Sequence, residues 1–218
     1  MCDRQVMAAS CLVTGATGYI GGRLVPRLLD AGCNVRCVVR DPAKLRDVSW
    51  RDDVGIVRGD VTSPADVARA LDGMDFAYYL VHSLAAAGFE ETDRSAAKVF
   101  ADAARDSGVR RIVYLGGLEP TDEQVSPHLR SRREVGRVLA DSGVDLVVLR
   151  AAIILGSGSA SFEMLRYLTE RLPVMITPRW VRNRVQPIAV RDVLRHLVAA
   201  ASAGPRQLVG GTSAGPTC

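Results

Sequence analysis

The chain has 218 residues, of which 48% are hydrophobic and 24% are charged, an ordinary balance for a globular protein with one well-buried core. The net charge is +4, but the arginines alternate with acids along the chain and only 5% of the residues are aromatic, so we expect no nucleic-acid partner. No apolar run approaches the roughly 20 residues that a membrane helix needs, and the first ten residues do not resemble a secretory signal. These features predict a cytoplasmic protein without a membrane partner.

The cysteines are five in number and scattered along the chain. They form no C-x-x-C pair and have no accompanying histidine cluster, so we predict neither a disulfide framework nor a zinc site. Cys33 and Cys37 flank or lie in a predicted buried strand, where a free cysteine behaves as a small apolar residue.

Strand-like and helix-like segments alternate from residue 11 to residue 150, a pattern typical of a parallel sheet with helices on both faces. The predicted strands are Cys11–Thr14, Asn34–Val39, Ile56–Val57, Phe76–Val81, Arg111–Leu115 and Asp145–Leu149. The predicted helices between them are Tyr19–Ala31, Pro64–Leu71, Glu90–Ser107 and Ser131–Ser142. Ser63 is the expected N-cap of the second helix, with Pro64 at its first position.

Beyond Arg150 the alternation weakens. We predict a helix over Ser161–Leu172, a stretch of loop and short strand over Pro173–Pro187, and an amphipathic helix over Val190–Ala201. The segment from Gly204 onward has the composition of a frayed tail.

A glycine-rich turn lies between the first predicted strand and the first predicted helix. Gly15, Gly18 and Gly21 are spaced G-x-x-G-x-x-G, which suits a tight turn, a close approach of backbone to a pyrophosphate, and close helix–strand packing. The free N–H groups at the helix start then meet the phosphate charge. The sequence therefore predicts a dinucleotide-binding turn with these residues: Gly15, Ala16, Thr17, Gly18, Tyr19, Ile20 and Gly21.

Arg40 stands at the end of the second predicted strand, where an NAD-binding protein usually places an acid for the ribose 2′-hydroxyl. An arginine there holds a 2′-phosphate by charge-assisted hydrogen bonds. Arg36 and Lys44 would add positive potential nearby, whereas Asp41 is an acid one residue late that would favour NAD. On Arg40 we predict NADP as the cofactor in preference to NAD.

The segments TGATGYIGG, VVRDPAK and Gly59-Asp60 together resemble the atypical and extended short-chain dehydrogenase/reductase families. The chain is similar in particular to bacterial NAD(P)H-binding proteins related to NmrA-like regulators and isoflavone-reductase-like enzymes. The resemblance implies that Asp60, with Val61 beside it, binds adenine. It also implies that the residues ending the fourth strand line the ribose side of the cofactor: Leu80, Val81 and His82.

Active members of this family use a serine after the fifth strand and a Tyr-x-x-x-Lys on the next helix, where the lysine lowers the pKa of the tyrosine. Gly116 and Gly117 stand at the serine position, and the segment HLRSRREVG on the next helix has neither tyrosine nor lysine. No catalytic residue can be assigned, although His82 is the proton donor that residue type favours.

The expected organisation is one domain over residues 1–218, of the doubly wound α/β class. It comprises a Rossmann-type dinucleotide-binding core at 11–150 and a small substrate-side segment at 151–218, shortened relative to the family. Trp180, Arg182 and Arg184 are candidates to line a pocket for an anionic or aromatic substrate, with Trp180 alternatively covering the core.

Two functions stay open on these residues. The first is an NADPH-dependent oxidoreductase acting on a small molecule without the usual acid/base pair. The second is a non-catalytic NADP(H)-dependent redox sensor, regulator or assembly factor with a protein partner.

Overall fold

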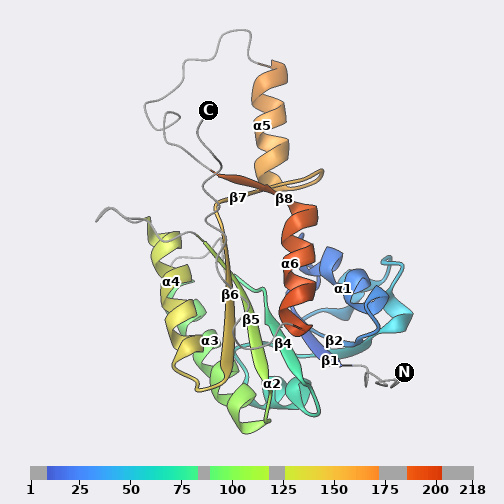
Figure 1. Ribbon diagram of the computed structural model, residues 1–218, viewed down its shortest axis with the longest axis vertical. Coiled ribbons are helices and arrows are strands. Elements are labelled where there is room, and N and C mark those ends of the chain that lie inside the picture. Colours follow the sequence, from blue (N-terminus) through green and yellow to red (C-terminus); the bar gives the residue numbers. More distant parts are fainter. Residues whose placement is uncertain (1–8, 83–88, 118–125, 172–185, 203–218) are drawn as a thin grey trace, which may run out of the picture.

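The computed structural model describes residues 9–82, 89–117, 126–171 and 186–202 (Figure 1). One sheet contains six parallel strands in the order β3-β2-β1-β4-β5-β6. The strands are β1 (Ser10–Thr14), β2 (Asn34–Val39), β3 (Gly55–Arg58), β4 (Phe76–Tyr79), β5 (Arg111–Gly117) and β6 (Asp145–Ala151). The predicted doubly wound α/β fold is therefore confirmed.

Helices cover both faces of this sheet. They are α1 (Gly21–Asp30) and α6 (Val190–Ser202) on one face, and α2 (Pro64–Leu71), α3 (Phe89–Asp106) and α4 (Pro127–Ala140) on the other, while α5 (Ala160–Arg171) packs on β7 (Ile153–Leu155) of a second sheet instead. Strand residues alternate between the faces, so that Val13 and Val113 pack on the side of α1 and α6, while Leu12 and Ile112 pack on the side of α2, α3 and α4. Each face thus has its own buried apolar cluster.

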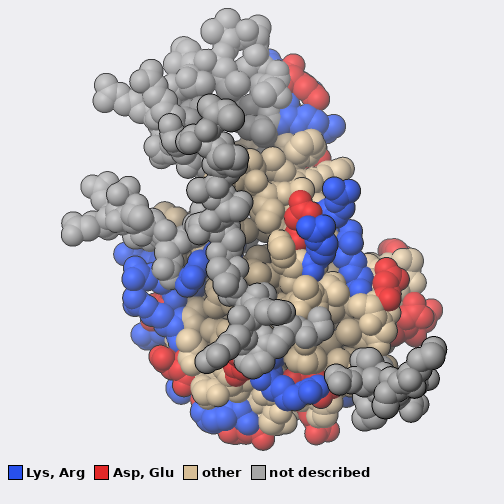
Figure 2. All heavy atoms as spheres, viewed as in Figure 1, with Lys and Arg blue, Asp and Glu red and all other residues tan. Residues whose placement is uncertain are grey.

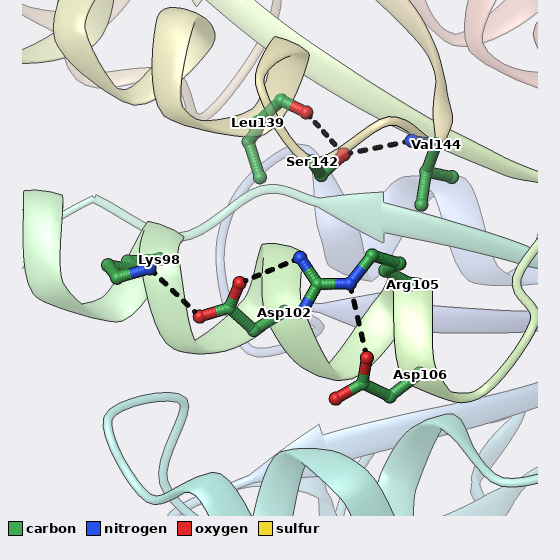
Figure 3. Close-up of polar contacts among 7 residues, drawn as sticks. All are labelled: Lys98, Asp102, Arg105, Asp106, Leu139, Ser142 and Val144. Carbon is green, nitrogen blue, oxygen red and sulfur yellow. Dashed lines mark hydrogen bonds and ion pairs between the residues drawn. The ribbon is translucent and has the colours of Figure 1, made fainter.

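The helix boundaries follow local capping. Ser63 accepts a hydrogen bond from the Asp66 N–H at 3.4 Å, which confirms it as the N-cap of α2. Helix α4 begins at Pro127, four residues earlier than predicted, because Ser126 caps it in the same way. The chain leaves α4 through a turn in which Ser142 Oγ donates to the Leu139 carbonyl and accepts from the Val144 N–H (Figure 3).

The sequence did not reveal a second, two-stranded parallel sheet, in which β7 (Ile153–Leu155) pairs with β8 (Pro187–Ala189). Three-residue strands carry too little periodicity to be seen in a sequence. In Figure 1 this small sheet and α5 lie beyond the carboxyl ends of the main strands. The predicted loop over 173–187 and the tail from residue 204 lie almost wholly outside the described residues.

The 3-10 helices η1 (Pro42–Leu45) and η2 (Arg51–Asp53) lie between β2 and β3. Cys11 and Cys37 are buried in β1 and β2, and burial raises the pKa of the Cys37 thiol to about 12, so it packs as an apolar side chain. Within the described residues, no helix has both the length and the apolar character to cross a membrane.

Candidate functional site

A cavity of about 490 Å³ opens at the carboxyl edge of the main sheet. It lies where the strand order reverses, because the chain proceeds from β1 through β2 to β3 on one side and from β4 through β5 to β6 on the other. Ligands of open α/β sheets bind at such a switch point. The predicted cofactor residues on its wall are Gly15, Thr17, Gly18, Arg40, Asp60, Val61, Leu80, Val81 and His82.

The turn after β1 can be formed only by glycine at its first position. Gly15 has φ +70°, and a Cβ there would lie 2.7 Å from the Leu80 carbonyl oxygen at the end of β4. The backbone of Leu80 is held in place, because Thr14 Oγ1 accepts a hydrogen bond from the Leu80 N–H at 2.9 Å and donates one to the Tyr78 carbonyl at 3.0 Å. A Cβ on Gly21 would run into the Gly15 carbonyl itself.

The N-terminus of α1 has no side-chain cap, and the N–H groups of Gly22 and Arg23 donate to the carbonyls of Gly18 and Ile20 within the turn. Ile20 is its N-cap residue and supplies no side-chain hydrogen bond, and the first turn contains no acid. Backbone N–H groups at an uncapped helix start carry partial positive charge, and glycines let a phosphate approach them closely. The turn therefore fits a pyrophosphate.

Arg40 is exposed on the cavity wall directly after β2. Its neighbour Asp41 uses one carboxylate oxygen to accept from the Ala43 N–H at 3.0 Å, which caps η1. Arg36 does not line the cavity, and its guanidinium donates to the carbonyls of Ala70 and Asp72 at the end of α2, so its contribution to the potential near Arg40 stays a prediction. Lys44 is exposed on η1 and is not part of the cavity wall.

The loop after β3 holds Asp60 in place. Asp60 Oδ1 accepts from both the N–H and the hydroxyl of Thr62, at 2.9 and 2.8 Å, and the Asp60 N–H donates to Asp66 Oδ2 at 3.1 Å. Thr62 also lines the cavity. The carboxylate that the family resemblance assigns to adenine is thus fixed at the cavity edge by its own loop.

His82 closes the β4 side of the cavity and has an unsatisfied polar atom. Its Nδ1 is buried without a hydrogen-bond partner among the described residues, and its ring lies 6.0 Å from that of Tyr114. Burial and the nearby Arg132 guanidinium lower the pKa of His82 to about 4, against the smaller opposing effects of Asp93 and a backbone hydrogen bond with Leu115. His82 is therefore neutral at pH 7, which argues against the proton-donating role that its residue type favoured.

This lowered pKa predicts a pH-dependent stability. Unfolded His82 binds a proton below about pH 6.5, whereas the folded protein does so only below about pH 4. Stability is therefore fully present above pH 6.5 and is lost as the pH falls toward 4, by about 3 kcal/mol at 1.36 kcal/mol per pKa unit.

Urea unfolding of wild type and His82→Gln between pH 4 and 7 tests this. In His82→Gln the free energy of unfolding should depend much less on pH, whereas in His196→Gln, an exposed control on α6, it should depend on pH as in the wild type. Equal slopes in wild type and His82→Gln would contradict the prediction.

Helix α3 contributes wall residues that sequence reasoning missed: Thr92, Asp93 and Ala96. Asp93 is buried and accepts from Ser131 Oγ of α4 at 3.1 Å. The only sequence signal was an acid within an otherwise small-residue helix stripe, which by itself indicates nothing about a cavity. Val38, Val39, Gly59 and Tyr79 also line it, as neighbours of predicted residues along the strands.

Four predicted turn residues do not line the cavity: Ala16, Tyr19, Ile20 and Gly21. Tyr19 instead faces the loop after β7, where its hydroxyl donates to the Ser157 carbonyl at 3.1 Å. Arg23 stacks on the Tyr19 ring and donates to the same carbonyl at 3.2 Å. These contacts join the start of α1 to the second sheet, and cofactor contact by the four residues stays a prediction.

Among the described residues, β5 ends without a serine and α4 has no Tyr-x-x-x-Lys. β5 continues through Gly116 and Gly117, which have no side chain to donate or accept a proton. Tyr114 is buried, its hydroxyl donates to the Arg132 carbonyl at 2.9 Å, and burial raises its pKa above the usual range. Tyr78 is likewise buried, with its hydroxyl on the Leu197 carbonyl. The predicted pocket residues Trp180, Arg182 and Arg184 lie outside the described residues.

The glycine turn after β1 and the held Asp60 carboxylate meet at one switch-point cavity, which is the arrangement of a dinucleotide-binding protein. Residues 15–167 match the model of the NAD(P)H-binding family, and the chain belongs to that family.

The chain is 30% identical over 192 residues to ceramide reductase of Caulobacter vibrioides, covering 86% of this chain and 59% of the relative. It is 28% identical over 145 residues to photosystem II assembly factor Ycf39 of Cyanophora paradoxa, covering 65% and 44%. The chain thus spans less than two thirds of each. The crystal structure of Citrobacter sp. triphenylmethane reductase complexed with NADP(H) superposes with a TM-score of 0.60 at 24% identity, covering 74% of this chain and 55% of the other, which is a likeness of fold.

Proposed function

We propose that this protein binds NADP(H) and acts as an oxidoreductase on a small molecule without the usual Ser and Tyr-x-x-x-Lys. The observation that carries the proposal is the switch-point cavity with Arg40 on its wall. Gly15, Thr17 and Gly18 would hold the pyrophosphate, and Asp60 and Val61 the adenine.

Preference for NADP rests on the end of β2. The Arg40 guanidinium is exposed and free of any ion pair among the described residues, so a 2′-phosphate can form charge-assisted hydrogen bonds with it. Asp41, the competing acid, already uses one oxygen to cap η1. Both features favour a phosphate over a hydroxyl at this position.

The bound cofactor would supply hydride chemistry, and the protein would bind, orient and exclude water. His82 is neutral at pH 7 and would contribute an uncharged ring to the cavity wall rather than an imidazolium that donates a proton. Proton transfer to a product would then come from water or from the substrate side.

A second function has a specific observation in its favour. Gly116 and Gly117 leave the end of β5 without a reactive side chain, and the neighbouring Tyr114 is buried and hydrogen-bonded to backbone. A non-catalytic NADP(H)-dependent assembly factor or regulator needs a cofactor cavity and no acid/base pair. The likeness to an assembly factor supports this alternative.

Calorimetric titration with NADPH, NADH, NADP and NAD tests the proposal. We expect NADP(H) to bind at least tenfold tighter than NAD(H), which corresponds to about 1.4 kcal/mol or more. Oxidation of NADPH is then followed with quinones, enals and ketones. Turnover with any class supports the oxidoreductase, tight binding without turnover supports the regulator, and failure of all four nucleotides to bind would contradict both.

A further inference from the structure

Helix α4 is strongly basic, and it presents this charge on a surface that the cofactor cavity does not use. Its sequence has four arginines and one glutamate, compared with a net charge of +4 for all 218 residues. Figure 2 shows blue side chains gathering over α4 at the left of the view. The neighbouring α3 has a different character, because its charges pair within the helix, as in the Lys98–Asp102–Arg105 ladder (Figure 3).

The arginines of α4 divide into two groups. Arg130 faces α3 and pairs with Glu90 at 3.1 Å. The other three line a groove of about 190 Å³ between α4 and the ends of β5 and β6, together with Arg150 of β6: Arg132, Arg133 and Arg137. Within the part of the chain that the structure describes, none of these three has a carboxylate partner. Among the described residues, the three guanidinium groups of α4 therefore share one groove without a paired carboxylate.

Glycines make the groove deep enough to hold a ligand group. Gly116, Gly117 and Gly136 lie along it beside the ring of Tyr114. A Cβ on Gly117 would lie 3.0 Å from Leu129, and one on Gly136 would lie 3.5 Å from the Tyr114 ring. Side chains at these positions would fill the bottom of the groove that the arginines line.

Arg132 brings a half-buried positive charge to the groove. It is half-buried, and its charge helps to lower the pKa of His82 and opposes the rise in the pKa of Tyr114, so the guanidinium lies near both rings. A half-buried guanidinium without a carboxylate gains more from an anion than a fully solvated one, because water screens the interaction less.

We propose that the α4–β6 groove is an anion-binding site for a phosphate or carboxylate group of a small molecule. The groove is smaller than the roughly 300–1,000 Å³ of a pocket that encloses a whole drug-sized ligand, so it fits one anionic group rather than a peptide segment. Arginine forks bind planar carboxylates and phosphates with two parallel hydrogen bonds. None of the residues that line this groove lines the cofactor cavity, and the proposal does not depend on cofactor binding.

Amide NMR of ¹⁵N-labelled protein, titrated with inorganic phosphate and separately with acetate at constant ionic strength, locates the binding. We expect saturable shifts of the Gly116, Gly117 and Gly136 amides, with a roughly millimolar dissociation constant for the tighter anion. The more tightly bound probe identifies the group. Because the readout is local, phosphate that enters the cofactor cavity does not obscure it.

Variants separate a shaped site from general positive potential. The double variant Arg133→Gln/Arg137→Gln should weaken binding at these glycines at least tenfold, while Arg130→Gln, which removes one charge from the same helix, should change it less than twofold. Gly136→Ala keeps every charge but fills part of the bottom of the groove, and it should also weaken binding. Non-saturating shifts, equal effects of Arg130→Gln and the double variant, or tight binding of poly-glutamate with no response to phosphate or acetate would each overturn the proposal.

Discussion

Replacing Arg40 with alanine should lower the affinity for NADPH by about tenfold to hundredfold and leave the affinity for NADH nearly unchanged. The range corresponds to the roughly 1.5–3 kcal/mol of a hydrogen bond with a charged group. Arg40 is exposed on the cavity wall, so its loss should cost little folding stability. Calorimetry of both cofactors with wild type and variant measures the change in preference directly.

The matched control is Arg46→Ala, because Arg46 is exposed at the end of η1, outside the cavity wall, and its loss changes the net charge equally. Arg40→Lys should fall between wild type and Arg40→Ala, since lysine keeps the charge but not the two-pronged geometry. An equal loss of NADPH affinity in Arg40→Ala and Arg46→Ala would reduce the effect to long-range charge and refute the assigned role of Arg40.

Gly15→Ala should both destabilise the fold and abolish measurable cofactor binding. A non-glycine residue at φ +70° costs about 1–2 kcal/mol, and overpacking of the new methyl group against the Leu80 carbonyl adds about 1–3 kcal/mol. Thr14 holds β1 and β4 together, so relief requires the turn itself to move. Such movement would displace the backbone of the turn that we propose holds the pyrophosphate. Thermal unfolding and cofactor calorimetry measure the two effects.

Gly73→Ala is the matched control for this substitution. Gly73 has φ +69°, almost the same as Gly15, but a Cβ there would meet nothing within 4 Å. It should cost only the backbone term of about 1–2 kcal/mol and leave cofactor affinity intact. If the two variants unfold at the same temperature and bind cofactor equally, the close approach of Gly15 to β4 has no role in the site.

The sequence predicted the core of the fold well because its signals are local. β2 and α2 were predicted with their observed bounds, since a continuous apolar run and a Ser-Pro helix start are each visible within a few residues. The strand predicted over Phe76–Val81 ends at Tyr79 instead, because Leu80 turns to contact the glycine loop of β1. That contact joins residues 66 positions apart, which no local pattern reports.

By itself, the sequence determined the doubly wound class, the glycine turn and the position of Arg40, because strand alternation, glycine spacing and strand ends are properties of neighbouring residues. Only the tertiary structure showed that Arg36 binds the carbonyls at the end of α2 and does not line the cofactor cavity. It also showed that Asp93 of α3 lines that cavity and that three arginines of α4 share a groove. The physical reason is that a side chain's role depends on which elements pack against it. Helix α3 packs on β4 through Phe100 and Tyr79, and α4 packs on β6, which are contacts between segments far apart in the sequence.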